Sequence, residues 1–316
     1  MNLVWRVFLF VPLFLLLLSC SGQEGEERVG GPSLGLLRVI FAGDRFVAGE
    51  AGGAMLVSAD GKAWSAVQTS PRQPVSALAW DDTRLLALGY GLVGRDVVLE
   101  STDGRAWRQR FLDRYEEFTD MVWTGSRFVA VGEQGAVLLS DNAIDWWLAT
   151  PGPAGDAFLT DLDLQNGRLL AVGWGGWILN SDDDGESWSG QQLADQSVLL
   201  EGVVSNGSRT VAVGFDGVIF VSDDGANWRE VNSGTRQHLL GVAWGGDRFV
   251  AVGFEGTIIE STDGLNWSPL ASGTRRILTS VAWGNGRFAV VGRQGAVIAY
   301  AVGGVPVQGR IDAGNL

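Results

Sequence analysis

Short apolar runs separated by glycine-bearing turns recur along nearly the whole chain. Within residues 239–267 three such runs, Leu240–Trp244, Phe249–Gly253 and Thr257–Glu260, are separated by Gly-Gly-Asp and Glu-Gly, and a fourth begins at Trp267. Runs this short, rich in Val, Ile, Phe and Trp, predict strands that are joined by hairpins. The unit returns as LTSVAWGNGRFAVVGRQGAVIAY, so the pattern predicts an all-β repeat protein.

The second strand of the predicted unit occurs seven times. Its copies read DRFVAG, TRLLALG, SRFVAVG, GRLLAVG, SRTVAVG, DRFVAVG and GRFAVVG, beginning at residues 44, 83, 126, 167, 208, 247 and 286. Four short strands in each unit of about 40 residues are typical of a β-propeller blade. The sequence therefore predicts a seven-bladed β-propeller of four-stranded antiparallel blades over residues 37–316, closed into a ring that leaves no open sheet edge.

Six units carry a turn motif, Ser-x-Asp-(x)-Gly-x-x-Trp or a close variant, between the predicted third and fourth strands. Ser and Asp side chains accept hydrogen bonds from turn amides, glycine supplies a positive φ, and the tryptophan packs into the next strand. We expect these residues to stabilise the fold: Ser58, Asp60, Trp64, Ser101, Asp103, Trp107, Ser140, Trp146, Ser181, Asp183, Trp188, Ser222, Asp224, Trp228, Ser261, Asp263 and Trp267.

Two units depart from the motif. Ala143 replaces the glycine in the third, and the seventh has Tyr-Ala-Val-Gly at residues 300–303 instead. For the outer strand of the seventh blade the sequence offers Val305–Ile311, or alternatively an N-terminal strand near Arg28–Ser33.

The six motifs resemble the Asp-box, or BNR, repeat. The sequence around residues 233–240 and 252–258 is similar to the photosystem II stability/assembly factor type of propeller, and the resemblance covers residues 37–300. It implies a propeller fold. It does not specify an activity, because Asp-box propellers include sialidases, endoglucanases, sorting receptors and assembly factors.

Residues 1–19 are expected to be a helical targeting segment that precedes the fold. Arg6 is followed by the twelve-residue apolar run Val7–Leu18, which as a helix rises about 18 Å and cannot span about 30 Å of hydrocarbon. The run and the following Ser19-Cys20 resemble a bacterial lipoprotein signal peptide. The resemblance implies cleavage before Cys20, lipid modification of that cysteine, and, from Ser21, the outer membrane of the cell envelope. An ordinary secretory signal with a chance cysteine is the alternative.

Residues 20–36 would then be the acylated cysteine and a flexible tether, because the segment is rich in glycine and glutamate and has no apolar period. The predicted domains are thus residues 1–19, 20–36 and 37–316.

The charge and the amino-acid composition limit the partners and the kinds of site that we expect. The formal charge of −13 disfavours nucleic acid as a partner, because its affinity depends on Lys and Arg. With one cysteine, Cys20, and one histidine, His238, the chain has neither an internal disulfide nor a Cys/His metal cluster. We expect no metal, no cofactor and no catalytic residue. His238 has no nucleophile or metal partner that the sequence can place, and is interpreted as an ordinary loop residue.

In a propeller, the loops between the second and third strands and the loops between blades lie on one face. Aromatic side chains flanked by arginines are typical of binding hot spots. The predicted partner-binding face contains Tyr90, Arg114, Trp174, Phe215, Arg236, Phe254, Arg275 and Arg276. The alternative for the aromatic rings is that they pack on the loop of the adjacent blade.

A second arginine set occurs once per blade, just before the second strand, in the hairpins of the opposite face. We expect it to pair with an aspartate or with turn carbonyls of the repeat. The set is Arg45, Arg84, Arg127, Arg168, Arg209, Arg248 and Arg287.

The sequence leads to two hypotheses about function, from different classes. The first is a surface-tethered, non-catalytic binding or assembly scaffold for a protein or a glycan. The alternative is a sialidase-like or endoglucanase-like glycoside hydrolase. An inverting mechanism needs two carboxyl groups about 6.5–9.5 Å apart. The candidates are Glu50, Glu133, Asp156, Asp216 and Glu255; the sialidase Arg-Ile-Pro start is absent from the sequence.

Overall fold

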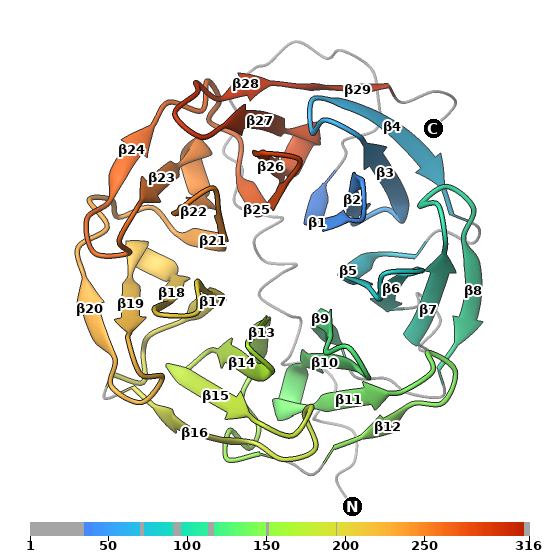
Figure 1. Cartoon of the computed structure of the whole chain (residues 1–316), viewed down its shortest axis with the longest axis horizontal. Coiled ribbons are helices and arrows are strands. Elements are labelled where there is room, and N and C mark those ends of the chain that lie inside the picture. The colour runs from blue at the N-terminus through green and yellow to red at the C-terminus, as the bar shows by residue number, and fades with distance from the viewer. Residues whose placement is uncertain are drawn as a thin grey trace, which may run out of the picture. The chain divides into compact units, whose positions relative to one another are not determined.

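A computed structural model of the protein describes residues 35–69, 73–90, 96–112, 117–149, 152–193 and 195–312. The described strands form seven antiparallel blades around a central channel (Figure 1). The predicted all-β, seven-bladed propeller is thereby confirmed. The signal segment and Cys20 lie outside the described residues.

Each blade runs from its inner to its outer strand in chain order. Blade 1 is β1 (Leu36–Ala42), β2 (Arg45–Glu50), β3 (Ala54–Ser58) and β4 (Ala63–Gln68); blade 2 is β5 (Val75–Trp80), β6 (Leu85–Tyr90), β7 (Asp96–Ser101) and β8 (Arg108–Phe111); blade 3 is β9 (Phe118–Trp123), β10 (Phe128–Gly132), β11 (Val137–Ser140) and β12 (Trp147–Leu148); blade 4 is β13 (Leu159–Gln165), β14 (Arg168–Gly173), β15 (Trp177–Ser181) and β16 (Ser189–Gln192). Blade 5 is β17 (Leu200–Ser205), β18 (Thr210–Gly214), β19 (Ile219–Ser222) and β20 (Arg229–Val231); blade 6 is β21 (Leu239–Gly245), β22 (Arg248–Gly253), β23 (Ile258–Ser261) and β24 (Ser268–Leu270); blade 7 is β25 (Leu278–Gly284), β26 (Arg287–Gly292), β27 (Val297–Ala301) and β28 (Val307–Gln308).

The ring closes through its inner strands. Each inner strand contacts the inner strand of the next blade, and β25 contacts β1. Second strands such as β10 and β18 are buried along their whole length, because both faces of a blade pack against neighbouring blades. Phe46, Phe128, Phe249 and Phe288 are fully buried in this way and fill the space between sheets. The core is therefore a series of apolar layers between blades.

The turn motifs lie on one face of the ring and are held by their own hydrogen bonds. In blade 6 the Ser261 hydroxyl donates to Asp263 Oδ1 at 2.9 Å, and the Gly264 N–H donates to Ser261 Oγ at 2.8 Å. Asp263 Oδ1 also accepts the Asn266 N–H, and Trp267 Nε1 donates to the Gly264 carbonyl at 3.1 Å. Blades 1, 2, 4 and 5 repeat this arrangement.

The third motif keeps the turn with different residues. Asn142 Oδ1 accepts the N–H groups of Ile144 and Asp145, and Ala143 adopts the positive φ of 64° that glycine has elsewhere. The indole nitrogen of Trp146 is buried without a hydrogen-bond partner.

The arginines before the second strands pair with acidic side chains or turn carbonyls of the repeat on this same face, as predicted, and five of the seven reach the next blade. Arg45 Nη1 donates to the carbonyl of Asp103 in the next blade at 2.9 Å, and Arg287 Nη1 donates to that of Asp60 at 3.3 Å. Arg84 and Arg209 reach the turn motif of the following blade in the same manner. Arg127 pairs with Asp141 and Glu186, Arg168 with Asp182, and Arg248 with Glu260.

The C-terminal segment spans two blades. β28 completes blade 7, as predicted for this segment, but β29 (Arg310–Asp312) pairs in parallel with β4 of blade 1. The prediction that Val305–Ile311 forms one outer strand of blade 7 is therefore wrong beyond residue 308. The open edge of β4 explains the difference, because the Arg310 N–H donates to the Lys62 carbonyl at 2.8 Å and Ile311 packs on the apolar layer between blades 7 and 1.

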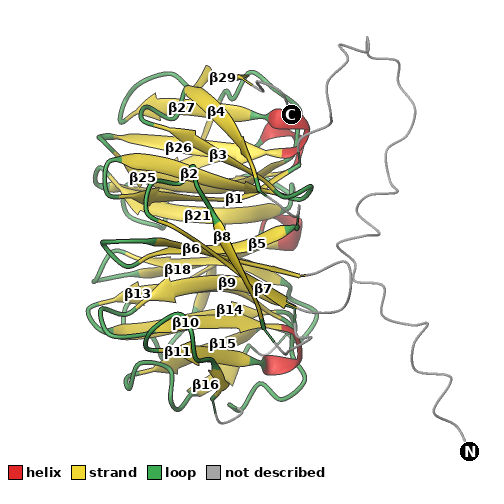
Figure 2. Cartoon of the chain, turned by 90° about the vertical axis from the view of Figure 1, so that its right-hand side faces the viewer, coloured by secondary structure: helices red, strands yellow, loops and turns green. Residues whose placement is uncertain are grey.

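The loops between second and third strands lie on the opposite face. Four of them form 3-10 turns: η1 (Glu133–Gly135), η2 (Phe215–Gly217), η3 (Phe254–Gly256) and η4 (Arg293–Gly295). Figure 2 shows these turns together on one side of the ring, which we call the turn face. Among the described residues, no helix has both the length and the apolar character needed to cross a bilayer.

Candidate binding face

Paired side chains surround the channel mouth on the turn face. In six blades the first residue after the second strand donates its N–H to the carbonyl just before the inner strand, at 2.8–3.0 Å. In blades 3 to 7 the second strand ends in a glycine that permits this approach, because a Cβ on Gly253 would lie only 1.9 Å from the His238 carbonyl oxygen. The mouth pairs are Gly35–Ala51, Glu117–Glu133, Phe158–Trp174, Leu199–Phe215, His238–Phe254 and Ile277–Arg293. The matching loop of blade 2 includes residues 91–95, which lie outside the described residues.

Aromatic rings dominate the mouth over blades 4 to 6. Phe158 and Trp174 are stacked with their centroids 4.7 Å apart. His238 stacks on Phe215 of the preceding blade at 4.3 Å and meets Phe254 edge-on at 4.8 Å. All five rings are half-buried, so each keeps part of its surface in contact with solvent. We call Phe158, Trp174, Phe215, His238 and Phe254 the aromatic arc.

Hydrogen bonds fix the polar edges of the arc. Trp174 Nε1 donates to Glu201 Oε1 at 2.8 Å, and burial raises the pKa of Glu201 to about 7. His238 Nδ1 accepts the Asp216 N–H at 2.8 Å, so a neutral imidazole carries its proton on Nε2. The rings are thus held in fixed orientations.

Blade 3 places two carboxyl groups at the mouth in place of aromatic rings. Glu117 and Glu133 are half-buried and interact through a hydrogen bond. Burial, followed by the charge and hydrogen bond of Glu133, raises the pKa of Glu117 to about 7. Burial also raises the pKa of Glu133. The pair therefore retains a proton at pH values where exposed glutamates are fully ionised.

Below the mouth, Arg38 reaches across the channel from blade 1 to blade 4. Its Nη1 donates to Asp161 Oδ1 at 2.9 Å, and its Nη2 donates to the carbonyls of Thr160 at 2.7 Å and Thr119 at 3.2 Å. The channel encloses about 260 Å³ here. Burial and the nearby Asp120 raise the pKa of Asp161.

Carboxylates in the channel also join adjacent blades. Asp120 accepts the Leu162 N–H at 3.0 Å, and Asp161 accepts that of Val203 at 2.8 Å. Asp163 accepts the Ser205 N–H at 2.8 Å, and burial raises its pKa to about 6.

The predicted face residues fall into three groups. Trp174, Phe215 and Phe254 belong to the aromatic arc, where the rings both pack against loops and remain half-exposed. Arg236, Arg275 and Arg276 are exposed on the loops that lead into blades 6 and 7. Tyr90 ends β6, although its side chain is not described, and Arg114 lies outside the described residues.

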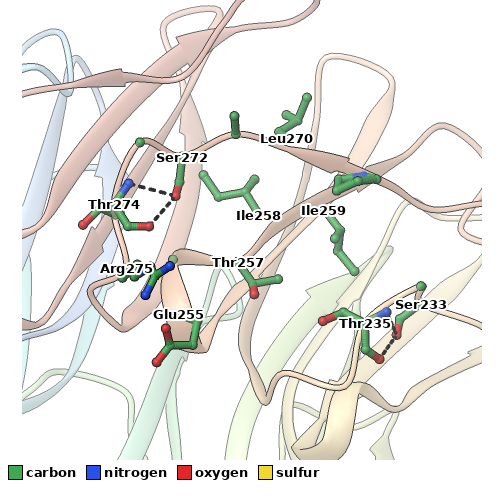
Figure 3. A pocket seen from close by; sticks show the side chains of 15 residues that line it. Ser233, Thr235, Glu255, Thr257, Ile258, Ile259, Leu270, Ser272, Thr274 and Arg275 are labelled. Carbon is green, nitrogen blue, oxygen red and sulfur yellow. Dashed lines mark hydrogen bonds between the residues drawn. The ribbon is translucent and has the colours of Figure 1, made fainter.

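Arg275 lines a groove of about 670 Å³ between the loops of blades 5 and 6. Segments 233–235, 255–259 and 269–275 form its walls (Figure 3). The Ser233 and Ser272 hydroxyls each donate to a carbonyl of their own loop, that of Thr235 or Thr274, at 3.1 Å. The groove therefore has a mixed lining, with Ile258, Ile259 and Leu270 beside the serine and threonine side chains and one arginine.

Sequence reasoning missed Glu117, Phe158, Glu201 and Arg38, and assigned no ring contact to His238. The sequence does contain a signal for three of these residues. Glu117, Phe158 and His238 each stand just before an inner strand, so aligning the seven units on that strand would have paired them with the turn residues.

The carboxylates considered for glycoside hydrolysis serve different local roles. Glu50 accepts the N–H groups of Gly35, Gly52 and Ala54. Glu133 pairs with Glu117, and Asp156, Asp216 and Glu255 are exposed. Within the part of the chain that the structure describes, no three His, Cys, Asp or Glu residues are grouped to hold a metal ion.

Comparison with known proteins identifies the fold. No protein-family profile and no curated protein sequence matches the chain. Among solved structures, YCF48 from Cyanidioschyzon merolae is similar with a TM-score of 0.70 and 17% identity, over 88% of this chain and 99% of that one. A structure described as YCF48 bound to D1 peptide has a TM-score of 0.70 and 15% identity, over 85% and 93%. The Cps50 (Swd1) propeller domain of Myceliophteria thermophila has a TM-score of 0.60 and 15% identity, over 82% and 93%. These similarities show a shared propeller fold.

Proposed function

We propose that this protein is a non-catalytic scaffold that binds a partner protein through its turn face. The aromatic arc carries the proposal. It is a set of half-exposed rings in which Trp174 Nε1 and His238 Nδ1 are already hydrogen-bonded, so its free surface is largely suited to apolar contact. The exposed Arg236 and Arg275 flank it.

The structural similarities support a protein as the partner. YCF48, which shares the fold, is described bound to the D1 peptide. A propeller of this type can therefore hold a segment of another protein. We extend the same class of partner, a protein segment, to this chain.

The proposal includes a membrane tether at Cys20 and an Asp-box identity for the six turn motifs. The signal-like residues 1–19 and the position of the chain's one cysteine support the tether. The cell envelope, and within it the outer membrane, is the proposed location. Replacing Cys20 with Ala should release the protein from the membrane fraction; membrane retention of that variant would exclude the lipid anchor.

The test of the face is affinity capture from native membranes, followed by identification of the captured protein. Phe215→Ala and Phe254→Ala, combined with Arg236→Ala and Arg275→Ala, should abolish capture and shift the melting temperature by only a few degrees. The matched control is Phe111→Ala, because Phe111 is 58% exposed on the outer strand of blade 2. Undiminished capture by the fourfold variant would refute the assigned face.

A further inference from the structure

Charged side chains of both signs stand around the channel mouth. Glu117 and Glu133 stand at blade 3, whereas Arg236, Arg275 and Arg276 are carried by the loops into blades 6 and 7. Arg293 occupies the mouth pair of blade 7. Asp216 and Glu255 are also exposed, on the turns of blades 5 and 6, so the arginines there share the turn face with carboxylates, whereas the described mouth pair of blade 3 is acidic alone.

The acidic pair and the aromatic arc are joined by backbone contact. The Gly135 N–H of turn η1 donates to the carbonyl of Ala157 at 2.6 Å, and Ala157 directly precedes Phe158. Glu133 and the Phe158–Trp174 stack are thus on segments that touch. Carboxylates beside aromatic faces attract cations through both ion pairing and cation–π contact.

The guanidinium of Arg38, in the channel below the mouth, is already hydrogen-bonded. The guanidinium of Arg38 donates to Asp161, Thr160 and Thr119 inside the channel. Asp120, Asp163 and Glu201 add further acidic groups around it. The described residues of this sector therefore have more acidic than basic side chains.

We propose that the partner segment carries a basic side chain flanked by apolar residues, and that the Glu117–Glu133 pair receives the basic group beside the Phe158–Trp174 stack. This inference rests on the proposed function and specifies the partner's chemistry. A lysine or arginine at this position satisfies both carboxylates, while its apolar neighbours cover the arc.

Binding of a cation should also release a proton. The pair shares a proton near neutral pH, and a cation placed between the carboxylates favours their ionised forms. Among the described residues, the charged group that faces Glu117 is Glu133. Proton release on binding is therefore a signature that a purely structural pair would lack.

The test uses the full-length protein and three capped synthetic heptapeptides, in which Lys, Gln or Glu stands between Leu and Phe residues. Calorimetry at pH 6.5 in two buffers of different ionisation enthalpy measures both affinity and proton release. We expect the Lys peptide to bind about tenfold more tightly than the Gln peptide, with proton release, and the Glu peptide to bind most weakly.

Glu117→Gln with Glu133→Gln should remove both the Lys preference and the proton release, while leaving the weaker binding of the Gln peptide. Glu255→Gln, at the exposed turn of blade 6, is the control and should retain both. Equal affinity for the three peptides, a preference for Glu, or loss of the preference in the control would overturn the inference. If no peptide binds but the aromatic variant still abolishes membrane capture, the partner chemistry is wrong and the proposed function stands.

Discussion

The tryptophans of the turn motifs differ in one hydrogen bond. Trp267 Nε1 donates to the Gly264 carbonyl, whereas Trp146 Nε1 is buried without a partner. Removing a buried donor that is bonded leaves its acceptor unsatisfied and costs free energy, whereas removing a donor without a partner leaves no acceptor unsatisfied. The two positions therefore separate the contribution of the indole nitrogen from that of the ring.

Replacing Trp267 with Phe should lower the free energy of unfolding by about 1–2 kcal/mol, because the Gly264 carbonyl loses its donor and the smaller ring leaves a gap. Trp146→Phe should cost clearly less, since it also removes an unsatisfied polar atom. Chemical denaturation of both variants makes the comparison. A larger loss at Trp146 would show that ring volume alone sets the effect.

At the scale of the inner strands, Arg38 holds blades 1, 3 and 4 together. Arg38→Met should destabilise the protein by about 3–5 kcal/mol, because Asp161 loses its cation in a buried site. Adding Asp161→Asn should restore part of that loss. Urea denaturation of the single and double variants measures it, and equal stability of the two would exclude an uncompensated charge as the cause.

The strands were predictable from sequence because each repeat encodes them locally. The runs of Val, Ile and Phe, the glycine turns and the Ser-x-Asp motifs lie within one unit of about 40 residues. The bond from Arg38 to Asp161 joins residues 123 positions apart and has no counterpart among the described residues of the other blades, so no periodicity reveals it.

The candidate binding face was predicted only in part. Trp174, Phe215 and Phe254 stand in recognisable turns, so their place at the mouth followed from the repeat. Glu117 and Phe158 lie just before inner strands, and their role depends on a bulge that sequence patterns do not show. Each inner strand shifts register near its start, for example between Leu159 and Asp161, which brings the preceding residue beside the turn.

For the whole molecule, folding shifts the pKa values of two sets of carboxyl groups in opposite directions. Burial raises the folded-state pKa of Glu117 and Glu201 to about 7 and that of Asp163 to about 6, above their ordinary values near 4. Backbone and side-chain hydrogen bonds lower the pKa of the turn aspartates Asp224 and Asp263. The raised groups bind protons more tightly when folded, so the stability they contribute is lost as pH rises through 6 to 7. The lowered groups contribute stability that is lost as pH falls below about 4.

Thermal stability should therefore be highest near pH 5 and fall by several degrees towards pH 8. Glu201→Gln should reduce the loss of thermal stability between pH 5 and 8. Asp263→Asn should instead change the loss of stability at acidic pH. Melting curves across pH 3–9 provide the measurement. A maximum above pH 7 in the unmodified protein would contradict the assigned burial of these carboxylates.

Ring closure at the rim depends on β29. Deleting residues 309–316 should lower the free energy of unfolding by about 1–3 kcal/mol, because the edge of β4 loses its parallel partner and Ile311 no longer covers the apolar layer. Ile311→Ala should give a smaller loss. Val307→Ala is the control, because Val307 is 47% exposed and should be near neutral. If the truncated chain kept its full stability, β29 would not contribute to ring closure, and the contact between β1 and β25 would be enough.

The parallel pairing of β29 with β4 also sets an order of events during synthesis. Blade 1 contains β1, the first described strand to leave the ribosome, and β29, the last. Its outer layer cannot assemble until translation has reached Asp312, so a chain that is still being made exposes the unpaired edge of β4. Until the last residues have arrived, that edge can pair with strands of other nascent chains.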